Sequence, residues 1–217
     1  MKTGILFDLD GTLLDTLEDL LNASNYALSV HGFPPRTLRE LRSFVGNGAM
    51  NQMRLCAPEG TTPEKLQALL DTYKPYYTAH CRENTRPYDG ILEALAELGK
   101  DYPLGILSNK PDAAVKELCG EHFPGVYALG ETPGIPRKPA PDMLYKAMAD
   151  LGLDRAVYVG DSEVDILTAH TAGLPCLSVL WGFRGRHELD GAEGYCDDPK
   201  QLAAKVKELL NGYNHGK

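Results

Sequence analysis

The sequence predicts an α/β fold in which a parallel sheet carries an inserted helical domain. Short apolar runs that end in polar or glycine residues alternate with segments of helical spacing, a pattern typical of a parallel sheet covered on both faces. Residues 15–86 break this alternation, because they contain helical patterns and no convincing strand. One helix suffices to cross between parallel strands, so this interval is too long for a simple crossover. We therefore expect an α/β core over residues 1–14 and 87–217 and a helical cap over residues 15–86.

Five buried strands are expected in the core, each an apolar run with a polar or glycine boundary. They are the runs 4–9, 103–107, 126–129, 156–159 and 176–180. Helical spacing lies between most of them, for example over residues 91–98 after an Asp-Gly turn. The insert shows one apolar stripe over residues 17–28 and another over residues 66–77. The two connections between insert and core are expected near residues 14–16 and 83–87, and residues 86–90, which include Pro and Gly, have the composition of a turn.

Composition limits the class of protein and of ligand. With 217 residues, 43% hydrophobic and 24% charged, the chain can form a packed core without disulfides or structural metals. Its net charge of −8 repels polyanions, so we expect no nucleic-acid partner, and an anionic small substrate needs local cations.

The five cysteines form no C-x-x-C pair. No signal-like or membrane-spanning apolar stretch is found, so a cytoplasmic location is expected. Residues 211–217 are expected to form a frayed terminus.

Polar residues gather where the predicted strands end. Asp8 and Asp10 follow the first strand and point to the same side of an extended chain. Two such carboxylates at the end of a buried strand require a cation or a shared proton. Three further motifs follow later strands: Ser108-Asn109-Lys110, Lys138-Pro139, and Gly160-Asp161 with Asp165. Each alone is an ordinary turn, cap or solvated charge. Because open α/β sheets bind ligands at the carboxyl ends of their strands, we expect these motifs to form one site.

The ordered set D-x-D-G-T, S-N-K, K-P-x-P and G-D-x-x-x-D resembles the four motifs of the haloacid dehalogenase-like phosphohydrolases. The resemblance covers essentially the whole chain, and the helical insert is similar to the C1 cap of that family. Segments 45–48, 137–142 and 181–184 are most similar to the phosphoglycolate phosphatase branch. The resemblance implies a Rossmann-like parallel sheet with strand order 3-2-1-4-5 and an inserted α-helical cap domain.

The family's functional residues carry over to the matching positions of this chain. The resemblance implies that Asp8 attacks phosphorus to form an aspartyl-phosphate, and that Asp10 acts as general acid and then as general base. Ser108 and Lys138 are expected to bind the transferring phosphoryl group. The resemblance also implies Mg²⁺ held by Asp8, the backbone carbonyl of Asp10 and Asp161. Oxygen ligands without His or Cys favour magnesium over zinc.

Electrostatics gives a separate reason to expect cations at this position. A phosphomonoester carries nearly two negative charges, and each unit pair with the Asp8 carboxylate costs roughly 4 kcal/mol at 4 Å and an effective dielectric near 20. Because the chain as a whole is acidic, the compensating charge must be local. A magnesium ion and Lys138 together provide it.

The remaining expected site residues surround this centre. Substrate binding is assigned to Arg42, Gly46, Asn47, Gly48 and Asn109. The two glycines flank a loop that is expected to descend onto the substrate. Asp165 follows Asp161 by four residues, which would place both on one helical face and let Asp165 orient metal-bound water or Lys138. Thr12 is expected to fix the turn after the nucleophile.

The leading hypothesis is a magnesium-dependent phosphatase acting on a small phosphorylated metabolite, with 2-phosphoglycolate as first candidate. A closing cap favours small substrates because water must be excluded while the aspartyl-phosphate forms. A phosphomutase similar to β-phosphoglucomutase and a pyrophosphatase use the same core residues and stay open as alternatives. A non-catalytic phosphometabolite-binding protein would be expected to have a defective motif, and none is visible. No membrane partner is expected, and the chain is expected to be a monomer or a homodimer.

Overall fold

The α/β core is confirmed by the computed structural model, which describes residues 1–214. Within these residues a six-stranded sheet runs in the order β5-β4-β1-β6-β7-β8, and every neighbouring pair is parallel. Its strands are β1 (Thr3–Phe7), β4 (Leu104–Pro111), β5 (Tyr127–Glu131), β6 (Arg155–Gly160), β7 (Cys176–Val179) and β8 (Gly194–Cys196). The first five have the predicted order 3-2-1-4-5. The edge strand β8 was not predicted, because three residues are too few to show a periodic pattern.

Helices cover both faces of this sheet, and the sheet divides the core into two apolar clusters. One face packs against α5 (Ile91–Leu98), α6 (Asp112–His122) and α9 (Leu202–Asn214), and the other packs against α7 (Asp142–Leu151) and α8 (Glu163–Thr171). Successive residues of β1 alternate between the clusters, since Ile5 and Phe7 face the first and Leu6 the second. Burial on both faces explains why the strands read as continuous apolar runs.

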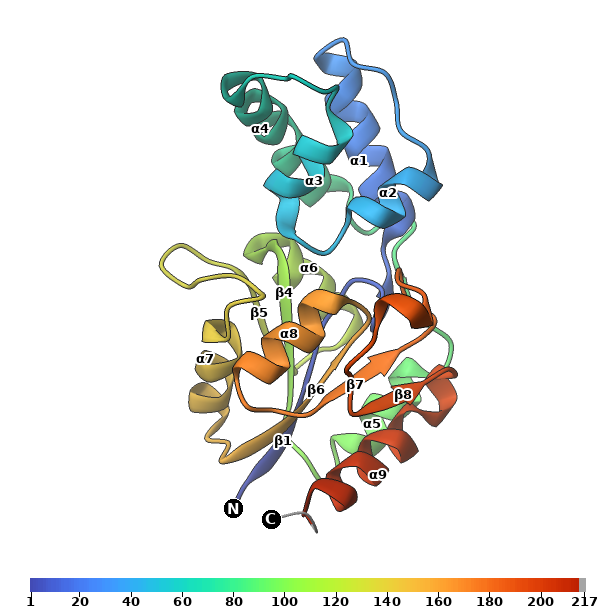
Figure 1. Cartoon of the computed structure of the whole chain (residues 1–217), viewed down its shortest axis with the longest axis vertical. Helices are drawn as coiled ribbons and strands as arrows, with labels where there is room; N and C mark the ends of the chain where they lie inside the picture. Colours follow the sequence, from blue (N-terminus) through green and yellow to red (C-terminus); the bar gives the residue numbers. More distant parts are fainter. Residues whose placement is uncertain (215–217) are drawn as a thin grey trace.

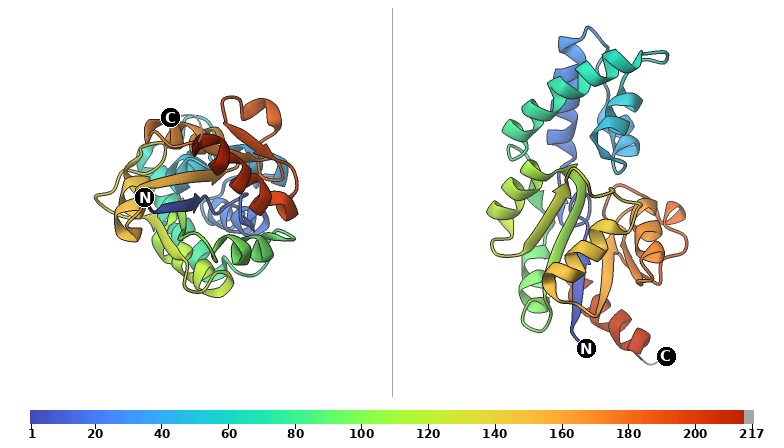
Figure 2. Two further views of the ribbon diagram at one scale, coloured as in Figure 1. Left: turned by 90° about the horizontal axis from the view of Figure 1, so that it is seen from below. Right: turned by 90° about the vertical axis from the view of Figure 1, so that its left-hand side faces the viewer.

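Four helices lie together beyond the carboxyl ends of the strands, as Figures 1 and 2 show. They are α1 (Leu17–Val30), α2 (Leu38–Phe44), α3 (Gly48–Cys56) and α4 (Pro63–His80), and we call them the helical unit. Local sequence sets two of their starts. Thr37 and Glu40 form a capping box at α2, and the Thr62 side chain caps α4.

Two antiparallel segments connect the helical unit to the core. They are β2 (Leu14–Asp15) and β3 (Arg86–Pro87), which pair with each other. The buried carboxylate of Asp19 on α1 accepts hydrogen bonds of 2.8–3.0 Å from backbone and side-chain groups of Asn84 and Thr85. The start of the unit is thereby tied to its exit.

The carboxyl-terminal region differs from the frayed terminus that the sequence predicted. Two short 3-10 turns, η1 (Arg186–Glu188) and η2 (Pro199–Gln201), lead to α9, which extends to Asn214. Residues 215–217 lie outside the described part of the chain. Among the helices of residues 1–214, none is both long and apolar enough to span a membrane.

Candidate active site

A cavity of about 40 Å³ lies between the carboxyl edge of the sheet and the helical unit. The predicted site residues that line it are Asp8, Asp10, Gly46, Gly48, Ser108, Asn109, Lys138 and Asp161. The described structure therefore brings together residues from all four motifs. The helical unit closes the opposite wall with apolar and aromatic side chains, among them Leu20, Tyr73 and Tyr77. This volume holds only a few water molecules.

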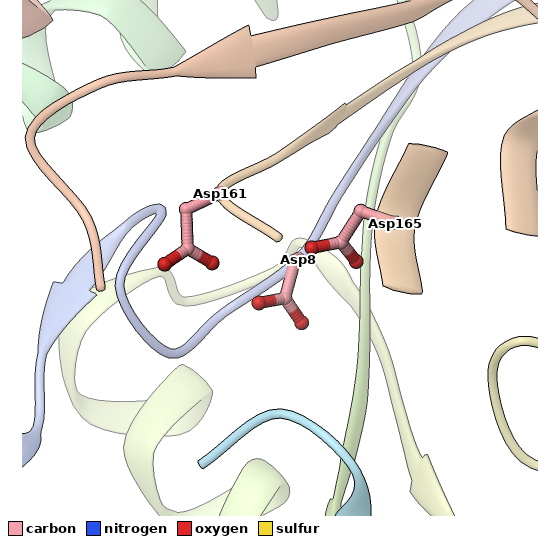
Figure 3. Close-up of side chains that lie close together, drawn as sticks. All are labelled: Asp8, Asp161 and Asp165. Carbon is pink, nitrogen blue, oxygen red and sulfur yellow. The ribbon is translucent and has the colours of Figure 1, made fainter. Parts of the chain in front are cut away.

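Three buried carboxyl groups meet on the sheet side of the cavity. Ligand oxygens of Asp8, Asp161 and Asp165 all lie within 4.8 Å of one another. Figure 3 shows the three side chains close together. Asp8 follows β1, Asp161 follows β6, and Asp165 lies in the first turn of α8. The expectation that Asp161 and Asp165 share one helical face was wrong, because Asp161 lies in the turn before α8.

The electrostatics of the three carboxyl groups fit a divalent cation. Burial raises the pKa of Asp8 to about 7, and it raises that of Asp161 well above its ordinary value, with repulsion from neighbouring carboxylates adding to both. Lys138 supplies one positive charge against the three carboxylates. Two negative charges stay unbalanced when all three are ionised, and oxygen donors of this kind suit a hard divalent ion.

Lys138 joins Asp8, which follows β1, to α8. Its ammonium group lies 2.6 Å from Asp8 Oδ1 and 2.7 Å from Asp165 Oδ1, and it donates to the Tyr158 hydroxyl at 2.9 Å. Burial opposes its charge, but Asp165 and Asp8 raise the pKa of Lys138 well above the ordinary value. Asp165 Oδ2 accepts from the backbone and hydroxyl groups of Ser162, so both its oxygens are occupied. Asp165 thus contacts Lys138 through one oxygen while Ser162 holds the other.

The Asp161 carboxylate depends on close approach of two backbone segments. A Cβ atom at Gly11 would lie 2.3 Å from Asp161 Oδ2, and one at Gly182 would lie 2.4 Å from the same oxygen. Gly11 also has φ +82°, a conformation that favours glycine. Asp161 Oδ2 accepts from the Phe183 backbone N–H at 2.6 Å, and Thr12 donates to Oδ1 at 3.4 Å. Thr12 therefore holds a carboxylate of the cluster as well as lying in the turn.

Asp10 lies beside Asp8 but has separate partners. Thr16 donates to Asp10 Oδ1 at 2.6 Å, and Lys110 Nζ also lies 2.6 Å from Oδ1. Ser108 donates to Asp10 Oδ2 at 3.3 Å. The carboxylate is thus paired with its own ammonium group, distinct from the cluster around Asp8.

The loop between α2 and α3 of the helical unit contacts the sheet at Asn109 of β4. The Asn109 amide donates to the carbonyls of Gly46 and Lys138, at 3.1 and 2.9 Å, and accepts from the Lys138 N–H at 2.9 Å. Gly46 and Gly48 both have positive φ and line the cavity. Asn47 precedes α3 and is not among the residues that line it.

Arg42 points to the core instead of into the cavity. It donates to the carbonyl oxygens of Gly182 and Phe183, at 2.5 and 3.0 Å. Arg184 makes the reverse contact, because it donates to the carbonyl oxygens of Arg42 and Val45 at 2.9 and 2.7 Å. The two arginines therefore hold the helical unit against the loop that follows β7.

Sequence reasoning passed over two cations of this site. Lys110 belongs to a recognised motif without an expected role, and Arg184 is not among the expected site residues, although both are buried and line the cavity. A signal for Lys110 was present, because residues two apart on a strand point to one side and Ser108 was already assigned. Arg184 binds backbone oxygens, and a contact of this kind leaves no motif in the sequence.

The chain belongs to the haloacid dehalogenase-like hydrolase family, whose sequence profile matches residues 5–179. Among similar curated proteins, the phosphoglycolate phosphatase of Mesorhizobium japonicum is 35% identical over 84% of this chain and 85% of its own. The phosphoglycolate phosphatase of Rhodobacter capsulatus is also 35% identical, over 85% of this chain and 87% of its own. A crystal structure from Lactobacillus delbrueckii, provisionally assigned as a phosphoglycolate phosphatase, has TM-score 0.88 and 37% identity, covering 95% of this chain and 99% of that one.

Proposed function

We propose that the chain is a magnesium-dependent phosphatase that hydrolyses a small phosphomonoester through an aspartyl-phosphate on Asp8. The observation that carries the proposal is the convergence of Asp8, Lys138 and Asp161 on one small cavity, with Asp10 and Ser108 beside them. Phosphoglycolate phosphatase is the name of the relatives described above, so 2-phosphoglycolate is the first substrate to test. The same names favour hydrolysis over the phosphomutase alternative.

Asp8, the backbone carbonyl of Asp10 and Asp161 are proposed to hold Mg²⁺, which supplies positive charge to the phosphoryl oxygens and to the nucleophile. Asp8 attacks phosphorus while Lys138 neutralises both reacting groups. Asp10 gives a proton to the leaving oxygen, and Ser108 donates its hydroxyl to a phosphoryl oxygen. Asp10 then takes a proton from the water that hydrolyses the aspartyl-phosphate.

The helical unit is proposed to act as a cap over residues 15–86, moving on the paired segments β2 and β3 against a core of residues 1–14 and 87–217. The small cavity supports this, because substrate entry requires displacement of that wall. The contacts of Arg42 and Arg184 with backbone oxygens across the interface support a defined closed position. The substrate contacts assigned to Gly46, Asn47 and Gly48 belong to the same proposal, as do a cytoplasmic location and a monomeric or homodimeric state.

The test measures phosphate release with Mg²⁺ from 2-phosphoglycolate, other phosphomonoesters and pyrophosphate. Asp8→Asn is expected to lower kcat at least about a thousandfold, as loss of a covalent nucleophile does. Asp150→Asn, at an exposed position of α7, is the matched control and keeps activity. Wild-type turnover by Asp8→Asn would disprove the nucleophile. If 2-phosphoglycolate ranks no higher than generic esters, the proposed substrate is wrong while the phosphatase proposal stands.

A further inference from the structure

Lys110 contacts the helical unit and the catalytic carboxyl group at once. Its ammonium group lies 2.6 Å from Asp10 Oδ1 on one side. On the other it donates to the hydroxyl of Tyr77 on α4 and lies 4.7 Å from the centre of that ring. Both side chains are buried, and the Tyr77 ring is stacked on Tyr73 with ring centres 5.5 Å apart. Lys110 is therefore held in a fixed place by the helical unit.

The partners of Asp10 distinguish its two oxygens. Oδ1 receives two donors, the Thr16 hydroxyl and the Lys110 ammonium group, both at 2.6 Å. Oδ2 has a single, longer contact of 3.3 Å with Ser108, the residue proposed to bind a phosphoryl oxygen. Oδ1 is therefore held by two close donors, and Oδ2, on the side of Ser108, is the oxygen left to contact a further group.

We infer that Lys110, held in place by Tyr77, is a positioning residue that directs Asp10 Oδ2 toward the leaving oxygen and so couples proton transfer to closure of the helical unit. This inference rests on the proposed phosphatase function. In the step concerned, an Asp8 oxygen forms a bond to phosphorus and the ester P–O bond breaks. Its electron pair stays on the leaving oxygen, which takes the proton from Asp10 Oδ2.

Tyr77 is suited to this task by chemistry as well as position. Burial, followed by the Asp10 charge, raises the pKa of Tyr77 well above its ordinary value, so its oxygen is a neutral acceptor for the ammonium group. Opening of the helical unit withdraws this contact and leaves Lys110 with Asp10 alone among these partners.

The test compares two substrates of similar size that differ in their need for a proton donor. The alkoxide of 2-phosphoglycolate must be protonated as it leaves, whereas acetyl phosphate releases acetate, a stable anion. The quantity compared is kcat/KM, which covers the steps up to formation of the aspartyl-phosphate. Lys110→Met is expected to lower kcat/KM about a hundredfold or more on 2-phosphoglycolate and less than tenfold on acetyl phosphate. Tyr77→Phe is expected to show the same selectivity with a smaller loss, because the ring stays.

Lys116→Met, at an exposed position of α6, is the matched control and leaves both values unchanged. Asp10→Asn serves as the reference for a lost proton donor. Equal losses on the two substrates, or no loss, would overturn the inference. If Lys110→Met does not fold, Tyr77→Phe decides alone, since it removes one hydroxyl group. Failure of the proposed function is recognised separately, because then either the wild type releases no phosphate or Asp8→Asn keeps wild-type turnover.

Discussion

The cluster around Asp8 predicts a stability that falls as pH rises when no divalent cation is present. Burial raises the pKa of Asp8 from 3.8 to about 7 in the folded chain. Between these values the folded chain keeps a proton that the unfolded chain has lost, so the free energy of unfolding decreases with increasing pH. For one group with these values, the loss amounts to about 2 kcal/mol between pH 5 and 7. Asp8→Asn removes the titrating group and with it this loss.

The measurement is urea unfolding, followed by circular dichroism, of wild type and Asp8→Asn in EDTA at several pH values from 5 to 7. The free energy of unfolding of Asp8→Asn minus that of wild type is expected to grow by about 2 kcal/mol over this range. Saturating Mg²⁺ is expected to stabilise wild type most at pH 7, where within this range the least proton must be displaced from Asp8, and to reduce the difference. A difference that is independent of pH in EDTA, or one that shrinks, would refute the assigned charge imbalance.

Three further substitutions test other parts of the site. Lys138→Met leaves two buried carboxylates without their ammonium partner. It is expected to lower the free energy of unfolding in urea and EDTA by about 3–5 kcal/mol and to abolish phosphate release. A loss of stability under about 1 kcal/mol would contradict this. Arg184→Met removes the bonds to the helical unit, and is expected to lower kcat/KM about tenfold by weakening closure, while Arg186→Met, which lacks those bonds, does not. Asp19→Ala leaves buried donors of Thr85 without their acceptor, and a loss of about 2–3 kcal/mol is expected in the same unfolding assay; unchanged stability would show that water replaces the carboxylate.

Much of the core was predictable because its signals are local. Each buried strand is an apolar run whose ends are marked by polar residues, and β1 places Asp8 and Asp10 directly after such a run. The expected order of five strands is observed, since the connections favour one arrangement. By contrast, β8 is three residues long and forms only against β7, so its existence depends on a neighbour distant in sequence.

The parts of the site that escaped prediction depend on contacts between the helical unit and the core. Arg42 was expected to bind substrate because a cation in a cap is a natural anion ligand. In the structure its donors are used by carbonyl oxygens more than a hundred residues away. Strand spacing places Lys110 on the same side as Ser108, but its contact with Tyr77 could not be predicted, because Tyr77 lies on a helix whose placement over the sheet cannot be read from periodicity. Sequence motifs therefore indicate where the site lies, whereas tertiary packing determines which cationic side chains contact it.

The arginine contacts across the interface have a consequence for how this architecture can diversify. Arg42 and Arg184 each bind main-chain oxygens on the opposite side, so each contact depends on one side chain and not on a matched pair. Side chains around the recipient carbonyls can change without loss of docking. Residues of the helical unit that face a ligand can therefore change while the unit keeps its position on the α/β core. Substrate selectivity can then change without altering the core residues that are proposed to carry out the reaction.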